Sequence, residues 1–403
     1  MVRHPGRRHF VALILVAALG EGCDAPPAPP AARPEAPRSP PLSRASSTAT
    51  PTATPPPITT ASAAPPEVPP VAACTAPSRS ASGLLDVRDD AALKRCGDPA
   101  VGARRPARPC GAGDPTSIPR KRLEAAVPAL DPKTRAHVAR IVAEGRAQGR
   151  RADVFGVVGD SMSISGAYLS ALAREETTTL APELEATFTV GDVSMLARFR
   201  GVAAITRRGV AQDSFVAWRA ARSGARAPWA LRGGRDAPLR RMVRWLSPAV
   251  AFVLFGGNDA AFYATDTETL VARFKEDLGH VVDALETAGV VPVLHTLARH
   301  GDAPGVPQCG IGEDGRPSDW RLMVRTNALS VAVVELACTR ALPLIDLRDA
   351  FDTADAAGLS SDATHPSVHR DGSGRLDAAG LRCGQNLRNY LTLRMLARLW
   401  PLL

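Results

Sequence analysis

The stretch VFGVVGDSMSISG (residues 154–166) decides the fold, because an apolar run meets a turn of small and polar residues here. Residues 154–159 are almost entirely apolar, which predicts a strand buried on both faces of a sheet. Residues 164–175 are predicted to form the helix that follows. Ser161 then lies at the carboxyl end of the strand, where parallel sheets bind their ligands. Taken alone, such a serine is more often a turn former or a helix cap than a nucleophile.

The alternation of strand and helix continues to the end of the chain. Further strands are predicted at 202–209, 249–257, 290–297 and 343–347, and further helices at 270–289, 319–341 and 378–399. Strands that alternate with helices form a parallel sheet with helices on both faces and right-handed crossovers. The loops after the strands therefore gather at one edge of the sheet and can share a site.

Two other loops at this edge carry polar groups. The third predicted strand ends in GGND (256–259), where the glycines permit close backbone approach and Asn258 offers an amide N–H₂. After the last strand, Asp362 and His365 are three residues apart, close enough for the carboxylate to hold one ring nitrogen. Each motif by itself also fits a plain turn or a surface loop.

In this order, the blocks VVGDSMSISG, FGGND and DATHP resemble the SGNH hydrolase superfamily, also called the GDSL-type esterases. The resemblance covers about residues 150–400, and Met162 stands where the family usually has Leu. It implies that Ser161 is the nucleophile and that His365 and Asp362 complete a catalytic triad. It also implies an oxyanion hole made by Ser161, Gly209 and Asn258. Gly209 comes from ITRRGVAQDS (205–214), the block with the loosest match.

The fold implied is α/β: a three-layer α/β/α sandwich with a parallel, flavodoxin-like five-stranded sheet, preceded by a disordered N-terminal region. The function implied is an exported serine esterase that hydrolyses carboxylic esters through an acyl-enzyme, without any metal or organic cofactor. Acetyl or short acyl groups on carbohydrate or cell-envelope material are the expected substrate, and a monomer is expected. Acyl transfer to glycans on the same fold and a catalytically inactive binding module are the alternatives.

The first 150 residues differ in composition from the rest. Residues 1–23 have a basic start, an apolar run and Cys23, which predicts a signal peptide, of lipoprotein type if Cys23 is lipidated. Residues 24–73 hold 16 of the 36 prolines and predict a disordered linker. Residues 74–150 form a basic extension before the hydrolase domain at 151–403; it docks on that domain, binds a surface polymer or lengthens the tether. The protein is expected to be exported, either secreted or periplasmic or held at a membrane as a lipoprotein.

The net charge of +9 does not indicate nucleic-acid binding, since aromatic residues make up only 4% of the chain and offer little base stacking. Within residues 151–403 the basic and acidic side chains balance, 28 against 28. Any membrane contact is expected only through a lipid at Cys23.

Six further cysteines form no C-x-x-C pair, so disulfides are expected instead of a zinc cluster, with the connectivity open. Three lie in the N-terminal region and three in the C-terminal region. Of the remaining histidines, His295 and His300 are candidates for lining the cleft. His280 is expected on a helix and His369 at the surface.

Overall fold

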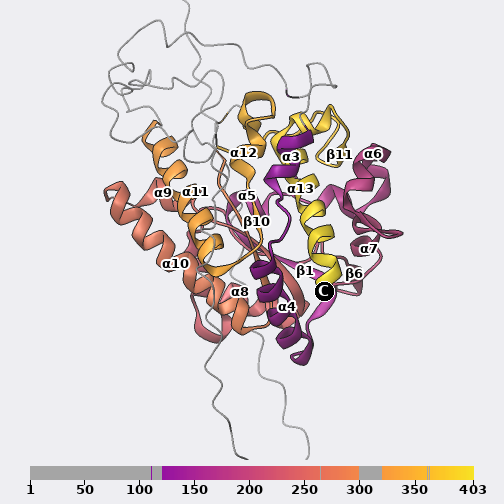
Figure 1. Ribbon diagram of the computed structural model, residues 1–403, viewed down its shortest axis with the longest axis horizontal. Coiled ribbons are helices and arrows are strands. Elements are labelled where there is room, and N and C mark those ends of the chain that lie inside the picture. The colour runs from indigo at the N-terminus through magenta and orange to yellow at the C-terminus, as the bar shows by residue number, and fades with distance from the viewer. Residues whose placement is uncertain (1–109, 111–119, 264, 299–319, 361, 363) are drawn as a thin grey trace, which may run out of the picture. The chain divides into compact units, whose positions relative to one another are not determined.

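The computed structural model describes residues 110, 120–263, 265–298, 320–360, 362 and 364–403 (Figure 1). The predicted signal peptide with Cys23, the predicted linker and most of the basic extension lie outside these residues, as does His300. None of the helices in the described ranges is both long and apolar enough to cross a membrane.

A five-stranded sheet forms the centre of the described chain. Its strands lie in the order β10 (Leu344–Ile345), β9 (Val291–His295), β8 (Pro248–Leu254), β1 (Arg151–Gly159) and β7 (Ala220–Ala221). Every neighbouring pair in this sheet is parallel. Read from the β7 edge, the chain order is 2-1-3-4-5, which is the flavodoxin-like order. The predicted α/β class and its five-stranded parallel sheet are confirmed.

In the described ranges, five helices are nine residues or longer: α4 (Pro132–Ala147), α8 (Pro238–Leu246), α10 (Thr267–Thr287), α11 (Trp320–Arg340) and α13 (Gly384–Leu399). The shorter ones are α3 (Arg120–Ala126), α5 (Ser161–Ile164), α6 (Pro182–Glu185), α7 (Met195–Arg200), α9 (Gly257–Phe262) and α12 (Leu347–Phe351). Small two-stranded pieces pair β2 (Thr179–Leu180) with β11 (Arg375–Leu376), β3 (Thr189–Val190) with β4 (Val193–Ser194), and β5 (Ile205–Arg207) with β6 (Val210–Gln212). The helices predicted at 270–289, 319–341 and 378–399 correspond to α10, α11 and α13.

Helices cover both faces of the sheet, because the central strands send alternate side chains into two apolar clusters. Phe155 and Phe252 belong to one cluster, together with buried residues of α3, α4, α7, α12 and α13. Val154 and Val253 belong to the other, together with buried residues of α8, α10 and α11. Figure 1 shows α10 beside α11, and α4 near the C-terminal end of the chain. All seven residues of β8 are buried, as expected for a strand covered on both sides.

The strand predicted at 202–209 is wrong. Residues 205–212 instead form the antiparallel hairpin of β5 and β6, which is separate from the central sheet. The hairpin turns at Arg208 and Gly209, both of which have positive φ, and most of its side chains are exposed. The second strand of the sheet in chain order is β7, which pairs with β1 and contains only Ala220 and Ala221. Two alanines carry almost no strand preference, which is why the sequence does not reveal this strand.

The helix predicted at 164–175 is also wrong. The chain leaves α5 after Ile164, and Leu169 adopts the left-handed conformation with φ of 66°. In the turn around Leu169, the side chain of Arg219 donates to the backbone carbonyls of Ser163, Ser165 and Tyr168 at 2.9, 3.0 and 2.6 Å. A distant arginine therefore helps to hold this part of the chain in a path that is not a continuous helix.

The described part of the basic extension packs on the sheet. Val138, Ile141 and Val142 of α4 are buried in the first apolar cluster, as is Leu123 of α3. A disulfide joins Cys110 to Cys383, just before α13, across 273 residues of sequence. Residues 120–150 thus follow the docking alternative, and Cys110 provides the bridge between the N-terminal and C-terminal regions. Cys338 is disulfide-bonded as well.

Candidate active site

Three strands of the central sheet end at the same level. Gly159 of β1 pairs with Ala221 of β7 on one side and with Leu254 of β8 on the other. The loops that follow these strands therefore begin side by side at the carboxyl edge of the sheet, where open α/β sheets bind ligands. Ser161 follows β1 by two residues, and Asn258 follows β8 by four.

The turn at the end of β1 leaves room for glycine only. A Cβ atom on Gly159 would lie 2.3 Å from the Ser163 hydroxyl and 2.5 Å from the Leu254 carbonyl. The next residue, Asp160, caps α5 by accepting a hydrogen bond from the backbone N–H of Met162 at 3.0 Å. Close packing and the cap together place Ser161 in the first turn of α5, half-buried at the edge of the sheet.

The structure brings Ser161, His365 and Asp362 together. The Ser161 hydroxyl lies 3.0 Å from His365 Nε2, although 204 residues separate them in sequence. The other ring nitrogen, Nδ1, lies 2.7 Å from Asp362 Oδ2. In this arrangement the carboxylate fixes the imidazole, and Nε2 faces the serine hydroxyl to accept its proton.

Asp362 is held as a carboxylate by donors on its own loop. Oδ1 accepts from the Ser360 hydroxyl at 2.7 Å and from the backbone N–H groups of Thr364 and His365 at 3.0 and 2.9 Å. Partial burial raises the pKa of Asp362, but these hydrogen bonds and the one to the His365 ring outweigh it and lower the pKa well below its usual range. The negative charge is thereby kept beside the imidazole, where it stabilises an imidazolium.

Asn258 lies at the same edge, half-buried in the first turn of α9. Its Nδ2 donates to the Ala225 carbonyl at 3.1 Å, which ties the loop after β8 to the loop after β7. An amide nitrogen carries two hydrogens, so one remains for a ligand. The bend before α9 depends on Gly256, which has φ of 126° and whose Cβ would lie 2.6 Å from Leu297.

The reason for choosing Gly209 as an oxyanion-hole donor does not hold in the structure. That residue was chosen as the glycine after the second strand of the sheet, but it lies in the exposed turn between β5 and β6. The glycine after the true second strand, β7, is Gly224, one residue before the Ala225 carbonyl that Asn258 contacts. The motif ARSGA (221–225) could have indicated it, had β7 been recognisable from the sequence.

Buried charges lie beneath the nucleophile turn. The fully buried Arg388 of α13 donates to the Met162 carbonyl at 2.7 Å, and its guanidinium lies 3.6 Å from the centre of the Tyr168 ring. Burial raises the pKa of Asp160 to about 6, against the opposing effect of the Arg388 and His365 charges. Burial, with a smaller contribution from the Asp160 charge, raises the pKa of Asp259 to about 7, although an N–H bond from Ala227 opposes it.

Two histidine expectations are wrong. His295 does not line the cleft: it is 1% exposed, and its Nδ1 lies 3.2 Å from the Val253 carbonyl. Burial lowers the pKa of His295 well below its usual value, which favours the neutral ring. His369 was expected at the surface but is buried, where its Nδ1 accepts from the backbone N–H of Asp371 at 3.1 Å. His280 lies on α10 as expected.

Comparison with known proteins matches more than half of the chain to one family model. Residues 157–369 match the family model of the GDSL-like lipase/acylhydrolase family. This range includes the loops that carry Ser161, Asn258, Asp362 and His365. No curated protein matches the chain.

Among the solved structures that are similar to this chain are two bacterial proteins. One is a protein from Parabacteroides merdae assigned as a GDSL-like lipase, at 16% identity and a TM-score of 0.36, covering 62% of this chain and 97% of that one. The other is a GDSL-like lipase from Bacteroides thetaiotaomicron, at 13% identity and a TM-score of 0.30, covering 58% of this chain and 90% of that one.

Proposed function

Because the chain belongs to the GDSL-like lipase/acylhydrolase family and is thus a hydrolase of ester bonds, we propose that it is a serine esterase with Ser161 as nucleophile. The observation that carries this proposal is the hydrogen-bonded row from Ser161 through His365 to Asp362. His365 Nε2 takes the hydroxyl proton as the Ser161 oxygen attacks the ester carbonyl. Asp362 stabilises the imidazolium that forms.

The developing oxyanion needs donors at the same edge of the sheet. We assign this role to the backbone N–H of Ser161, the side chain of Asn258 and the backbone N–H of Gly224, which replaces Gly209. Within the described residues the Gly224 N–H makes no hydrogen bond of its own. The imidazolium then protonates the leaving alcohol, and water, activated by His365, releases the acid from the acyl-enzyme. No step requires a metal or an organic cofactor.

For the substrate we propose short acyl esters on carbohydrate or cell-envelope material, handled by an exported protein. The signal-like segment at 1–23 and the proline-rich stretch after it support export. Transfer of the acyl group to a glycan hydroxyl uses the same acyl-enzyme with a sugar in place of water. Supplying an acyl donor with oligosaccharide acceptors and measuring free acid against acylated sugar separates hydrolysis from transfer.

The proposal is tested by the hydrolysis of p-nitrophenyl acetate. Wild-type protein should turn over this ester, and Ser161→Ala should lower kcat by about 10³-fold or more. Ser163→Ala, which changes a buried serine two residues away, serves as the matched control and should keep measurable turnover. A purified, folded Ser161→Ala variant with full activity would overturn the proposal, and a wild type without any turnover would favour the inactive binding module.

A further inference from the structure

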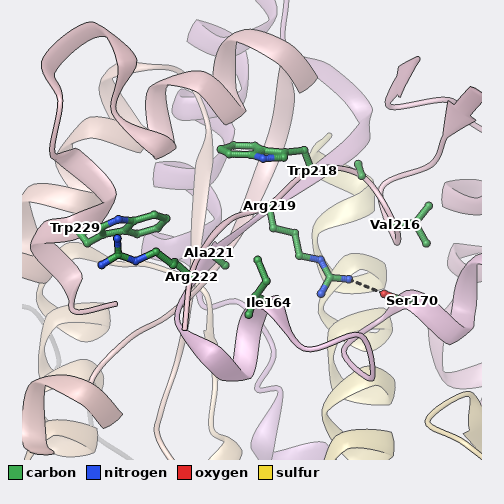
Figure 2. Close-up of a pocket in the computed structure, with 9 residues that line it drawn as sticks. Ile164, Ser170, Val216, Trp218, Arg219, Ala221, Arg222 and Trp229 are labelled. Carbon is green, nitrogen blue, oxygen red and sulfur yellow. Dashed lines mark hydrogen bonds between the residues drawn. The ribbon is translucent and has the colours of Figure 1, made fainter. Parts of the chain in front are cut away.

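A pocket of about 420 Å³ lies beside the nucleophile turn. Figure 2 shows Ile164, Val216, Trp218, Arg219, Arg222 and Trp229 around it. None of the lining residues takes part in the mechanism above, so the pocket is a separate element of the site.

The pocket is connected to the turn that carries Ser161 in two ways, through the chain and through a backbone hydrogen bond. Ile164 is the last residue of α5, the four-residue helix that begins at Ser161. On the other side, Arg222 follows β7, and its backbone N–H donates to the Gly159 carbonyl at 3.2 Å. The pocket therefore borders the turn that carries Ser161.

The walls of the pocket offer an exposed apolar surface. Ile164 is 44% exposed and Val216 is 39% exposed, although large aliphatic side chains are usually buried. The half-buried rings of Trp218 and Trp229 complete the lining. Apolar walls with a few polar groups are typical of small-molecule sites.

The charged groups that line the pocket are both cationic. The N–H groups of Arg219 donate to backbone carbonyls and to the Ser170 hydroxyl, and its buried guanidinium forms no ion pair with the acidic side chains that the structure describes (Figure 2). The guanidinium of Arg222 lies 5.2 Å from the centre of the Trp229 ring and is paired with no acidic side chain among the described residues. None of the lining residues is acidic.

The surrounding sequence strengthens this positive charge. Residues 200–244 contain eleven arginines and only two acidic residues, although the basic and acidic residues of 151–403 balance. A cleft lined by one sign of charge raises the local concentration of ligands of the opposite sign.

We propose that this pocket binds an anionic group of the ester substrate, a carboxylate or a phosphate, through Arg222, with the adjoining apolar part of the substrate against Ile164, Val216 and Trp218. This inference rests on the proposed esterase function and narrows its substrate to acidic esters. The anion can belong to the acyl group or to the alcohol group of the ester, because both are attached to the carbonyl carbon that Ser161 attacks.

The test uses two pairs of esters that differ in one charge. On the acyl side, p-nitrophenyl hydrogen glutarate is compared with its neutral methyl ester; on the alcohol side, para-acetoxybenzoate is compared with methyl para-acetoxybenzoate. The ratio of kcat/KM for the anionic and neutral members is measured in wild type, Arg222→Gln and Arg232→Gln. Taking the ratio between variants cancels the different chemical reactivity of the esters.

We expect Arg222→Gln to lower this ratio by about three- to tenfold in at least one pair, since an exposed charge-assisted contact is worth about 1 kcal/mol. Arg232 is an exposed arginine of the same basic segment that does not line the pocket, so its variant should leave the ratio unchanged. An unchanged ratio in Arg222→Gln for both pairs overturns the proposal. An equal loss in both variants also overturns it, because the effect would then be a long-range field and not a contact.

The pocket can be tested even if the esterase proposal fails. Ser161→Ala is titrated with para-acetoxybenzoate and with its methyl ester in a calorimeter, with and without the Arg222→Gln change. Tighter binding of the anion that depends on Arg222 supports the pocket whether or not the wild type hydrolyses esters. Equal binding of both compounds counts against the pocket alone. Binding of the anion that depends on Arg222, together with a wild type that hydrolyses none of the esters, counts against the esterase proposal alone.

Discussion

Single residues at the sheet edge divide into those that a motif reveals and those that only the fold reveals. Asp362 and His365 are recognisable from their spacing, because a three-residue separation lets one loop hold both groups. Ser161 and Asn258 are recognisable because each follows a long apolar strand. Gly224 is not, since the strand before it is two alanines and its own sequence context carries no marker.

The two candidate glycines can be compared directly by mutation. Gly209 and Gly224 have φ of 78° and 73°, and a Cβ on either one would meet no atom within 4 Å. Alanine at either position should therefore cost a similar free energy of unfolding, about 1 kcal/mol. Only Gly224→Ala should lower kcat for p-nitrophenyl acetate, by about tenfold or more, because it shifts an oxyanion donor. A larger loss of activity in Gly209→Ala would reverse our assignment.

Asp259 should make the stability depend on pH. Its folded pKa of about 7 lies above the usual value of 3.8, so folding favours the neutral acid. The stability that this provides is present below pH 4 and is lost as the pH rises through 7. Asp259→Asn has no carboxyl group to ionise, so its stability relative to wild type should increase between pH 4 and pH 8. The increase should be about 1.4 kcal/mol for each unit by which folding shifts the Asp259 pKa. Urea unfolding at several pH values measures this; parallel curves for the two proteins would contradict it.

At the scale of elements, the sequence predicts the helices and strands whose apolar residues recur with a clear period. It does not predict the segments whose conformation depends on contacts with distant residues. The long helix α10 and the buried strand β8 are confirmed because their apolar patterns are continuous. The segment 164–175 looks equally helical, but Arg219 bonds its carbonyls in another conformation. Such a contact joins residues about fifty positions apart, so no local pattern contains it. The same holds for β7, which is a strand only because β1 lies beside it.

The contribution of Arg219 to the nucleophile turn can be tested by mutation. Arg219→Met should lower the free energy of unfolding by about 2–4 kcal/mol, because several buried carbonyls lose their donor. It should also lower kcat, since the carbonyl of Ser163 in α5 is among them. Arg240→Met, at an exposed position of α8, is the control and should change neither quantity by much. Wild-type stability in a folded Arg219→Met variant would show that the segment holds its shape without the arginine.

At the scale of the whole molecule, the site joins segments from opposite ends of the domain. The loop that carries His365 packs against the start of α13, where Cys383 is bonded to Cys110. An even number of cysteines predicts disulfides but not their partners, because pairing depends on the folded distance between Cα atoms, which is 5.3 Å for Cys110 and Cys383. The sequence therefore predicts the sheet and the reacting residues, and the structure adds the covalent link between the two regions.

The Cys110–Cys383 bond should stabilise the fold, because it closes a loop of 273 residues and restricts the unfolded chain. The double variant Cys110→Ala/Cys383→Ala should lose about 2–5 kcal/mol of unfolding free energy. Denaturant unfolding of the two purified proteins without reductant measures the loss. Equal midpoints and slopes for both would mean that this bond contributes nothing to the domain.

The central claim is that His365 activates the Ser161 hydroxyl, and covalent labelling tests it most directly. Wild-type protein and His365→Ala are treated with a fluorophosphonate, and the rate and site of labelling are followed by mass spectrometry of the digested protein. We predict a single modified residue, Ser161, labelled at least about 10²-fold faster in wild type than in the variant. Labelling at another residue, or equal rates in the two proteins, would contradict the account.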